Sequence, residues 1–128
     1  MIFKSDWAKS RRPEKELFEY IGNMNNIPSV LPEQVVNVTA DYDNLSFTIQ
    51  GMGSVALRVN QREPDKFIQL VPEGKVPFQF ALNIYIRSGE QSECYFEIDA
   101  KLNPLMLMMA SRPLQNLVNM MAEKVYSL

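Results

Sequence analysis

The sequence predicts a single α+β domain over residues 1–128, in which an antiparallel sheet packs against a C-terminal helix. Three observations predict this class. Apolar residues recur at every second position through most of the stretch from Leu45 to Leu102, which is typical of half-buried strands. Turn residues divide that stretch into separate strands. After Asn103 the apolar spacing changes to three and four residues, which indicates an amphipathic helix.

The strands are predicted to follow one another as a meander. We expect them at residues 45–49, 55–59, 66–71, 78–87 and 93–102. Gly51 and Gly53 lie in the first connection, where they permit a tight hairpin. Residues 34–41, with Val36, Val38 and Ala40, are expected to form a strand before the meander. Residues 1–10 alternate weakly and are a candidate edge strand.

Two short helices are expected between these outer strands, at residues 13–22 and 25–31. Pro13 suits a first helical turn, and Pro32 ends the second helix. In the C-terminal segment Asn103 is a good N-cap and Pro104 a good first residue. Pro113 lies inside the helical pattern, where proline removes an amide donor. We therefore expect a kink or two abutting helices near residues 111 and 112.

The composition excludes several classes of protein. Thirteen Lys and Arg against 15 Asp and Glu give a net charge of −2 without a basic block, which argues against nucleic-acid binding. No apolar run is long enough to span a membrane, and charges near the start exclude a signal peptide, so no integral membrane association is expected. The lone Cys94 allows no intrachain disulfide and fits the reducing cytoplasm. Without histidine, imidazole catalysis and common zinc sites are excluded, and we expect no metal and no cofactor.

Several segments resemble a known superfamily. They are residues 18–21, the run FTIQGMG at 47–53, PFQF at 77–80, DAKLNPLM at 99–106 and SRPL at 111–114. Together with the order of elements, these segments resemble the short bacterial polyketide cyclase and lipid-transport-like branch of the START and Bet v 1 (SRPBCC) superfamily. The resemblance implies a helix-grip fold, in which a curved antiparallel sheet of about six to seven strands wraps around the long C-terminal helix. Arg12 departs from the family pattern, because relatives favour a capping residue such as Ser there.

A helix-grip sheet encloses a space beneath its helix, and the residues predicted to face this space are apolar. A ligand pocket needs mostly apolar lining, and methionine adapts to irregular guests. The candidate cavity-lining residues are Phe47, Leu57, Phe80, Leu82, Ile84, Phe96, Ile98, Met106, Met109, Leu117 and Met121. The same side chains can instead fill a close-packed core. The sequence leaves both arrangements open.

No set of residues predicts a catalytic centre. Acid–base chemistry needs an ionisable group inside the cavity, but Glu93, Glu97 and Asp99 alternate to the solvated face of their strand. Tyr20 and Tyr42 are candidate hydrogen-bond donors to a ligand, although tyrosine more often lines a core with its hydroxyl at the edge.

Cys94 points inward and is expected to be an inert buried thiol. Met108 and Met120 are expected to face outward on the last helix. They form either a patch for a second copy or an apolar surface, or scattered surface residues.

Three functions remain open. The first, and the one we expect, is the binding or carriage of a small hydrophobic ligand, lipid-like or polyketide-like, by a cytoplasmic protein. The second is a cyclase- or dehydratase-like enzyme of the same superfamily, which requires an inward-facing ionisable group. The third is an interaction module with a filled core, which works through its methionine-rich helix or an exposed strand edge. A homo-oligomer is compatible with each of them.

Overall fold

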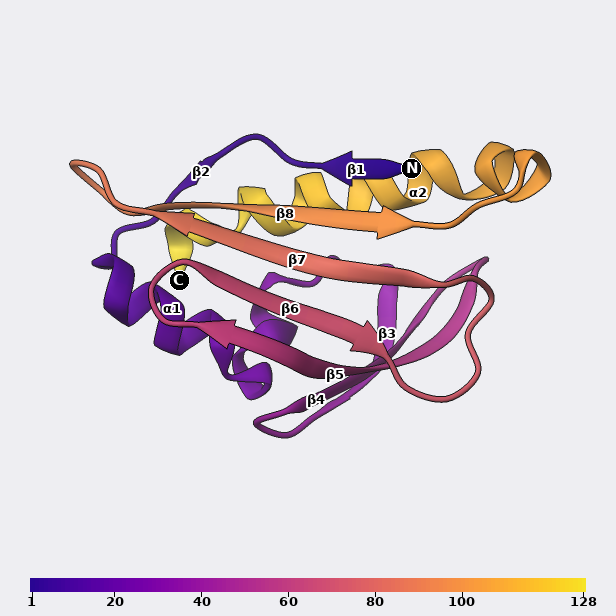
Figure 1. Cartoon of the computed structure of the whole chain (residues 1–128), viewed down its shortest axis with the longest axis horizontal. Coiled ribbons are helices and arrows are strands. Elements are labelled where there is room, and N and C mark those ends of the chain that lie inside the picture. The colour runs from indigo at the N-terminus through magenta and orange to yellow at the C-terminus, as the bar shows by residue number, and fades with distance from the viewer.

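Eight antiparallel strands form one curved sheet in the computed structural model, which describes residues 1–128 (Figure 1). The elements are β1 (Ile2–Lys4), β2 (Ala8–Lys9), α1 (Glu14–Gly22), η1 (Met24–Val30), β3 (Val35–Ala40), β4 (Asn44–Ile49), β5 (Gly53–Glu63), β6 (Phe67–Pro72), β7 (Phe80–Arg87), β8 (Glu93–Ala100), α2 (Pro104–Glu123) and η2 (Val125–Ser127). The strand order is β1-β8-β7-β6-β5-β4-β3, and β2 also pairs with β8. The predicted meander of strands and the long C-terminal helix are therefore confirmed.

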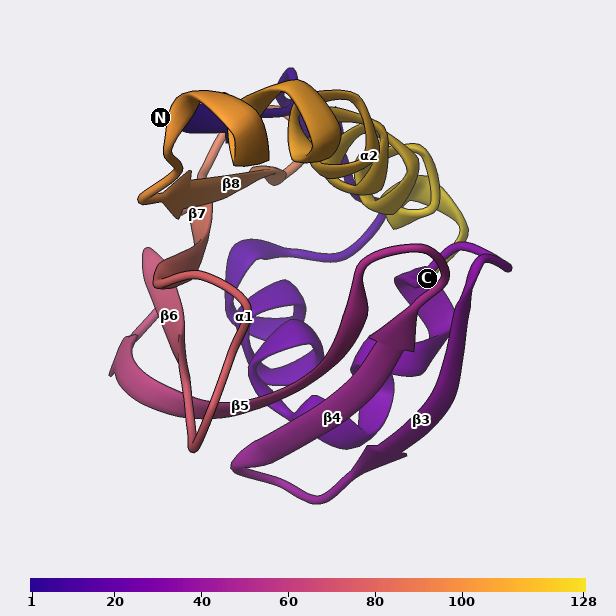
Figure 2. The same cartoon turned by 90° about the vertical axis from the view of Figure 1, so that its right-hand side faces the viewer.

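The sheet curls around the helices. Figure 2 shows the strands forming an arc from β8 to β3, with α1 inside the arc and α2 across its open side. α2 packs on β8 and β1, and η1 lies against β3, β4 and α2. None of the helices combines the length and the apolar character that a membrane crossing needs.

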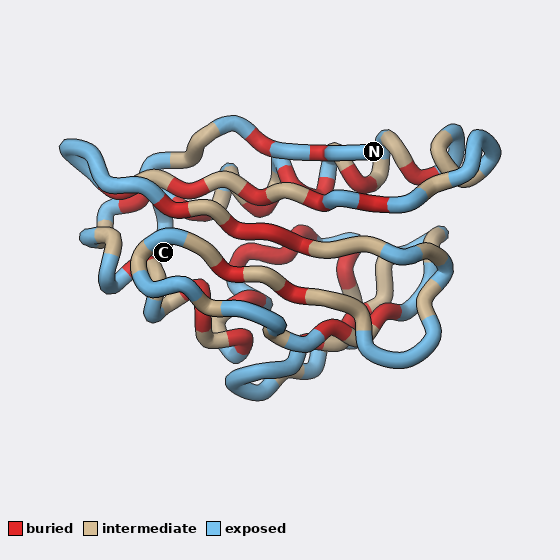
Figure 3. Tube along the Cα trace, viewed as in Figure 1, coloured by how far each residue is buried: buried red, intermediate tan, exposed pale blue.

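The alternation of the sequence decides which side chains enter this arc. Leu82 of β7 lies opposite Ile98 of β8, and Ile84 lies opposite Phe96. All four side chains are buried, whereas the positions between them along β8 are more exposed. Figure 3 shows the resulting change between buried and less buried positions along the strands. The core thus lies between the concave face of the sheet and the helices α1, η1 and α2.

The helix α2 begins as its sequence predicts. The side chain of Asn103 accepts a hydrogen bond of 2.8 Å from the backbone N–H of Met106, and Pro104 is the first helical residue. The expectation of two abutting helices is wrong, because α2 runs without interruption through Pro113. Proline removes the donor for the carbonyl of Met109, but Met109 is exposed, so water can bond this carbonyl in its place.

The N-terminal segment differs in detail from the expectation. Residues 1–10 form two short strands, and both pair with β8. Between them, the Ser5 hydroxyl accepts a hydrogen bond of 3.1 Å from the backbone N–H of Phe96. Pro13, and not Arg12, is the N-cap of α1, and no side chain caps this end. The second short helix is a 3-10 helix that starts at Met24.

The edge strand β3 is interrupted by a bulge. Its register against β4 shifts between Val36 and Thr39, and Asn37 has a positive φ of 54°. Asparagine tolerates this left-handed conformation better than most residues. The bulge breaks the predicted alternation, so that Val35 is buried while Val36 and Val38 are only half-buried.

Candidate ligand cavity

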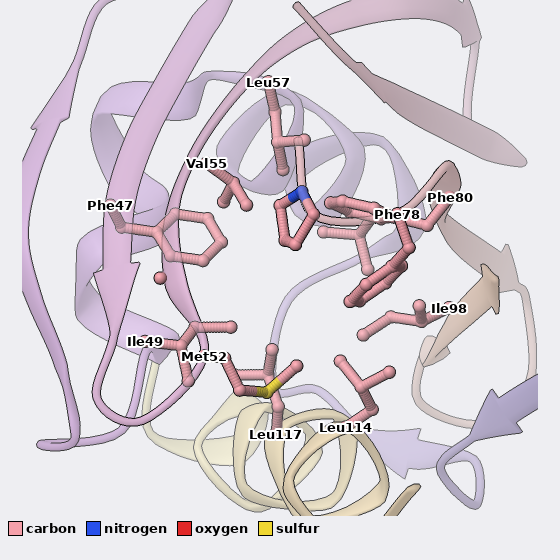
Figure 4. A pocket seen from close by; sticks show the side chains of 13 residues that line it. Phe47, Ile49, Met52, Val55, Leu57, Phe78, Phe80, Ile98, Leu114 and Leu117 are labelled. Carbon is pink, nitrogen blue, oxygen red and sulfur yellow. The ribbon is translucent and has the colours of Figure 1, made fainter. Parts of the chain in front are cut away.

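A small apolar cavity lies between the sheet and α2. Its volume is about 30 Å³, and 11 of its 13 lining residues are hydrophobic (Figure 4). The lining residues are Phe47, Ile49, Met52, Gly53, Val55, Leu57, Pro77, Phe78, Phe80, Leu82, Ile98, Leu114 and Leu117. A space of this size has room for little more than water, so side chains almost fill it.

Strand pairing brings the walls of the cavity together. Phe47 of β4 lies opposite Val55 of β5, and each side chain points to the same concave face. On the other side of the arc, Leu82 of β7 lies opposite Ile98 of β8. Because side chains alternate along strands, every second residue of these four strands faces inward. Leu114 and Leu117 of α2, three residues apart on one helical face, close the cavity on the side of the helix.

Three residues outside the regular strands form the mouth of the cavity: Met52, Pro77 and Phe78. They line both the inner cavity and a more open outer groove of about 140 Å³. The groove is completed by Gly51 and by residues of α2, namely Met106, Met109 and Ala110. The β4–β5 turn, the β6–β7 loop and the start of α2 meet at this end, which faces the viewer in Figure 2.

The mouth is held by a few contacts. The ring of Phe78 lies 5.5 Å from that of Phe80, centroid to centroid. The backbone N–H of Lys101 donates a hydrogen bond of 2.9 Å to the carbonyl of Gln79, which ties the β6–β7 loop to the segment before α2. Met52 comes from a turn in which Gly51 has a φ of +86°. The side chains of Met52 and Phe78 are half-buried and pack against the edge of the core.

The sequence-predicted lining residues fall into three groups. Phe47, Leu57, Phe80, Leu82, Ile98 and Leu117 line the cavity. Met106 and Met109 line the outer groove instead, and Met109 is 68% exposed. Ile84, Phe96 and Met121 lie in the packed core outside the cavity lining, with 0%, 0% and 1% of their surface exposed.

Other lining residues were not singled out by the sequence. Ile49, Val55 and Leu114 share inward faces with predicted residues, so their alternation or helical spacing could have identified them. Met52 and Pro77 lie in a turn and a loop, where no periodicity signals which way a side chain points. Phe78 shares the inward alternation of Phe80 in the predicted strand at residues 78–87, although the observed strand β7 begins only at Phe80.

The ionisable groups lie away from the cavity. Glu97 accepts a hydrogen bond of 2.9 Å from Asn83 on the outer face of the sheet. Burial, followed by the nearby Glu97, raises the pKa of both Tyr85 and Tyr95 on that face. The Tyr20 hydroxyl lies 3.4 Å from that of Ser29, and neither lines the cavity.

Two further candidates also lie outside the cavity. Tyr42 is exposed, and the Arg62 guanidinium lies 4.1 Å from its ring centroid. Burial raises the pKa of the Cys94 thiol to about 12, so the thiol is protonated and unreactive at neutral pH. No group of three or more Cys, Asp or Glu side chains is placed to hold a metal ion.

Comparison with solved structures settles the fold. The protein XoxI from Bacillus cereus superposes with a TM-score of 0.76 at 10% identity, covering 98% of this chain and 93% of that one. A START superfamily protein from Mycobacterium smegmatis gives 0.66 at 11% identity, covering 97% and 96%. The chain has a START-like helix-grip fold. The predicted sheet of about six to seven strands is slightly larger in the structure, because the first segment contributes two strands to a total of eight.

The helix-grip fold also occurs in a protein of a biosynthetic pathway. The di-domain ARO/CYC protein BexL, from the BE-7585A biosynthetic pathway, gives a TM-score of 0.73 at 12% identity. The match covers 99% of this chain and 45% of BexL. No family model and no curated protein sequence matches the chain. At such low identities the likeness is one of fold.

Proposed function

We propose that this protein binds a small hydrophobic molecule, lipid-like or polyketide-like, in the cavity between the sheet and α2. The observation that carries the proposal is that the inner cavity and the outer groove adjoin each other. Met52, Pro77 and Phe78 line both the inner cavity and the outer groove, so that only mouth side chains separate the inner cavity from the surface. A site of this kind is lined mostly by hydrophobic residues.

The proposed binding requires the mouth to open. The inner cavity of about 30 Å³ is far smaller than the several hundred Å³ typical of ligand pockets. A ligand therefore has to displace Met52 and Phe78, the mouth side chains that are half-exposed and not held by strand pairing. Apolar burial would supply about 25 cal/mol per Å² of surface removed from water.

Two measurements test the proposal on the purified protein. Native mass spectrometry should show a copurifying small molecule, and extraction should identify it. Titration with a hydrophobic fluorescent dye should show saturable binding that the extracted molecule displaces. If native mass spectrometry shows only the mass of the protein alone, and if no dye binds, then the cavity is merely part of the core.

Two variants and one control test whether the dye binds in this cavity. Phe78→Ala should increase dye binding, because it removes a mouth side chain. Leu117→Phe should decrease it, because a larger ring occupies the cavity. Glu97→Ala, on the outer face of the sheet, is the control and should leave it unchanged. Equal dye binding by all three folded variants would place the dye site elsewhere and overturn the proposal.

A further inference from the structure

The exposed face of α2 changes character along its length. Leu105, Met108, Met109 and Arg112 are spaced three and four residues apart, so their side chains share one face. The three apolar side chains are 66%, 81% and 68% exposed. The same face continues with exposed polar residues: Asn116, Asn119 and Glu123. The exposed apolar surface is thus confined to the first turns of the helix.

This apolar surface borders the mouth of the cavity. Met109 belongs to the exposed face, and it also lines the outer groove together with Met52 and Phe78. The first turns of α2 project at the same end as the β4–β5 turn and the β6–β7 loop, on the right of Figure 1. Figure 3 shows exposed positions over this part of the helix. Exposed apolar side chains gathered in this way are typical of interaction sites.

Along the chain, this apolar segment lacks acidic residues. Between Lys101 and Ala122 the sequence holds no Asp or Glu, although the whole chain has a net charge of −2. Lys101 and Arg112 are both exposed, and they stand on either side of the apolar residues along the chain. In the neighbouring β6–β7 loop, Lys75 offsets Glu73. Two exposed cations, Lys101 and Arg112, therefore flank the apolar residues along the chain, and the nearest exposed carboxylate in sequence is Asp99, two residues before Lys101.

We propose that the mouth face, defined as Lys101, Leu105, Met108, Met109 and Arg112, docks on an anionic lipid bilayer. Exposed apolar side chains flanked by basic ones are the pattern of helices that lie in a membrane interface. Flexible methionines adapt to such a fluid surface. In a two-fold dimer through the same face, by contrast, the Lys101 and Arg112 cations of both copies would enter one interface to which this face brings no acidic partner, which is unfavourable.

Docking would place the cavity mouth against the bilayer. A hydrophobic ligand could then pass between the membrane and the cavity through Met52 and Phe78 without crossing water. This transfer rests on the proposed ligand binding, whereas the bilayer contact stands without it. The two ideas can accordingly be tested separately.

Vesicle flotation tests the docking directly. The full chain should bind vesicles that contain phosphatidylglycerol, bind pure phosphatidylcholine vesicles less, and lose binding as salt is raised. The double variant Leu105→Ser/Met108→Ser should bind at least about tenfold more weakly, because two apolar side chains no longer insert. Arg112→Gln should weaken binding to the anionic vesicles only. Asn116→Ser, on the polar half of the same face, is the matched control and should bind as the wild type does.

Three outcomes would overturn the docking proposal. The first is that the wild type binds no vesicles. The second is that the double variant, shown to be folded by circular dichroism, binds as well as the wild type. The third is a wild-type dimer in analytical ultracentrifugation that the double variant loses while neither protein binds vesicles, which would make a second copy the occupant. Dye binding without vesicle binding overturns docking alone, and vesicle binding without dye binding overturns ligand binding alone.

Discussion

Arg62 of β5 donates two hydrogen bonds to the carbonyl oxygen of Gly22, at 3.0 Å from Nε and 2.8 Å from Nη2. The same Nη2 donates to the carbonyl of Tyr42 at 2.8 Å. The last turn of α1 contains no basic residue, so Arg62 provides the positive charge that favours the end of a helix. One side chain thereby fixes α1 inside the curve of the sheet.

Arg62→Lys should lower the free energy of unfolding by about 1–2 kcal/mol, because an ammonium cannot reproduce the forked contacts of the guanidinium. Urea denaturation measures this loss. Asp43→Asn is the control: it removes only the ion pair between Asp43 and Arg62, in which Asp43 is 60% exposed, and should cost less than about 1 kcal/mol. Equal costs for the two variants would contradict this account.

Gly51→Val should destabilise the domain by about 1–3 kcal/mol through backbone strain alone. Gly51 has a φ of +86°, and a Cβ added there would meet no heavy atom within 4 Å. A clash of the added Cβ is thus excluded as a cause. Gly51→Asn should cost less than Gly51→Val, because asparagine tolerates positive φ. Thermal unfolding of both variants checks the order, and an unchanged midpoint for Gly51→Val would show that the turn is not strained.

Phe96→Ala should cost about 3–5 kcal/mol, the range for a phenylalanine in a filled core, because Phe96 has none of its surface exposed and does not line the cavity. Phe80→Ala should cost clearly less, since Phe80 is half-buried and already faces the cavity. Urea denaturation compares the two. A smaller loss for Phe96→Ala than for Phe80→Ala would mean that the cavity lies nearer the middle of β8.

The stability of the protein should fall as pH rises above 9. The pKa of Cys94 is about 12 in the folded state against an ordinary value of 9.0, so the unfolded chain loses this proton first and is favoured. Between pH 9 and 10 the thiol alone should cost about 1 kcal/mol. Cys94→Ala should remove this loss. The raised pKa values of Tyr85 and Tyr95 act in the same direction above pH 10 and should persist in the variant.

Most of the fold could be predicted from the sequence because its signals are local. Alternating residues such as Phe96 and Ile98 specify an inward strand face, and the Asn103-Pro104 pair specifies the start of α2. The bulge at Asn37 could not be predicted in this way. It depends on how β3 meets β4 at the edge, and the residues on either side of Asn37 continue an alternating pattern.

The candidate site was predictable only in part. The inward faces of the strands identified walls such as Phe47 and Leu82, but all inward residues look alike in the sequence. Whether Phe96 fills the core or borders an empty space depends on the volume left between sheet and helix, which no local pattern encodes. Met52 closes the mouth through the path of a turn, and that path is set by tertiary contacts, whereas Phe78 continues the inward alternation of Phe80.

The bulge in β3 has a consequence for molecules that meet in solution. A regular outer strand presents an unbroken row of free N–H and C=O groups, against which a strand of another molecule can add. In β3 the left-handed Asn37 displaces this row partway along the strand. At the opposite edge β1 is only three residues long. Neither border of the sheet offers an incoming strand a long run of matching partners, so the protein is protected from growing into fibrils by edge-to-edge addition.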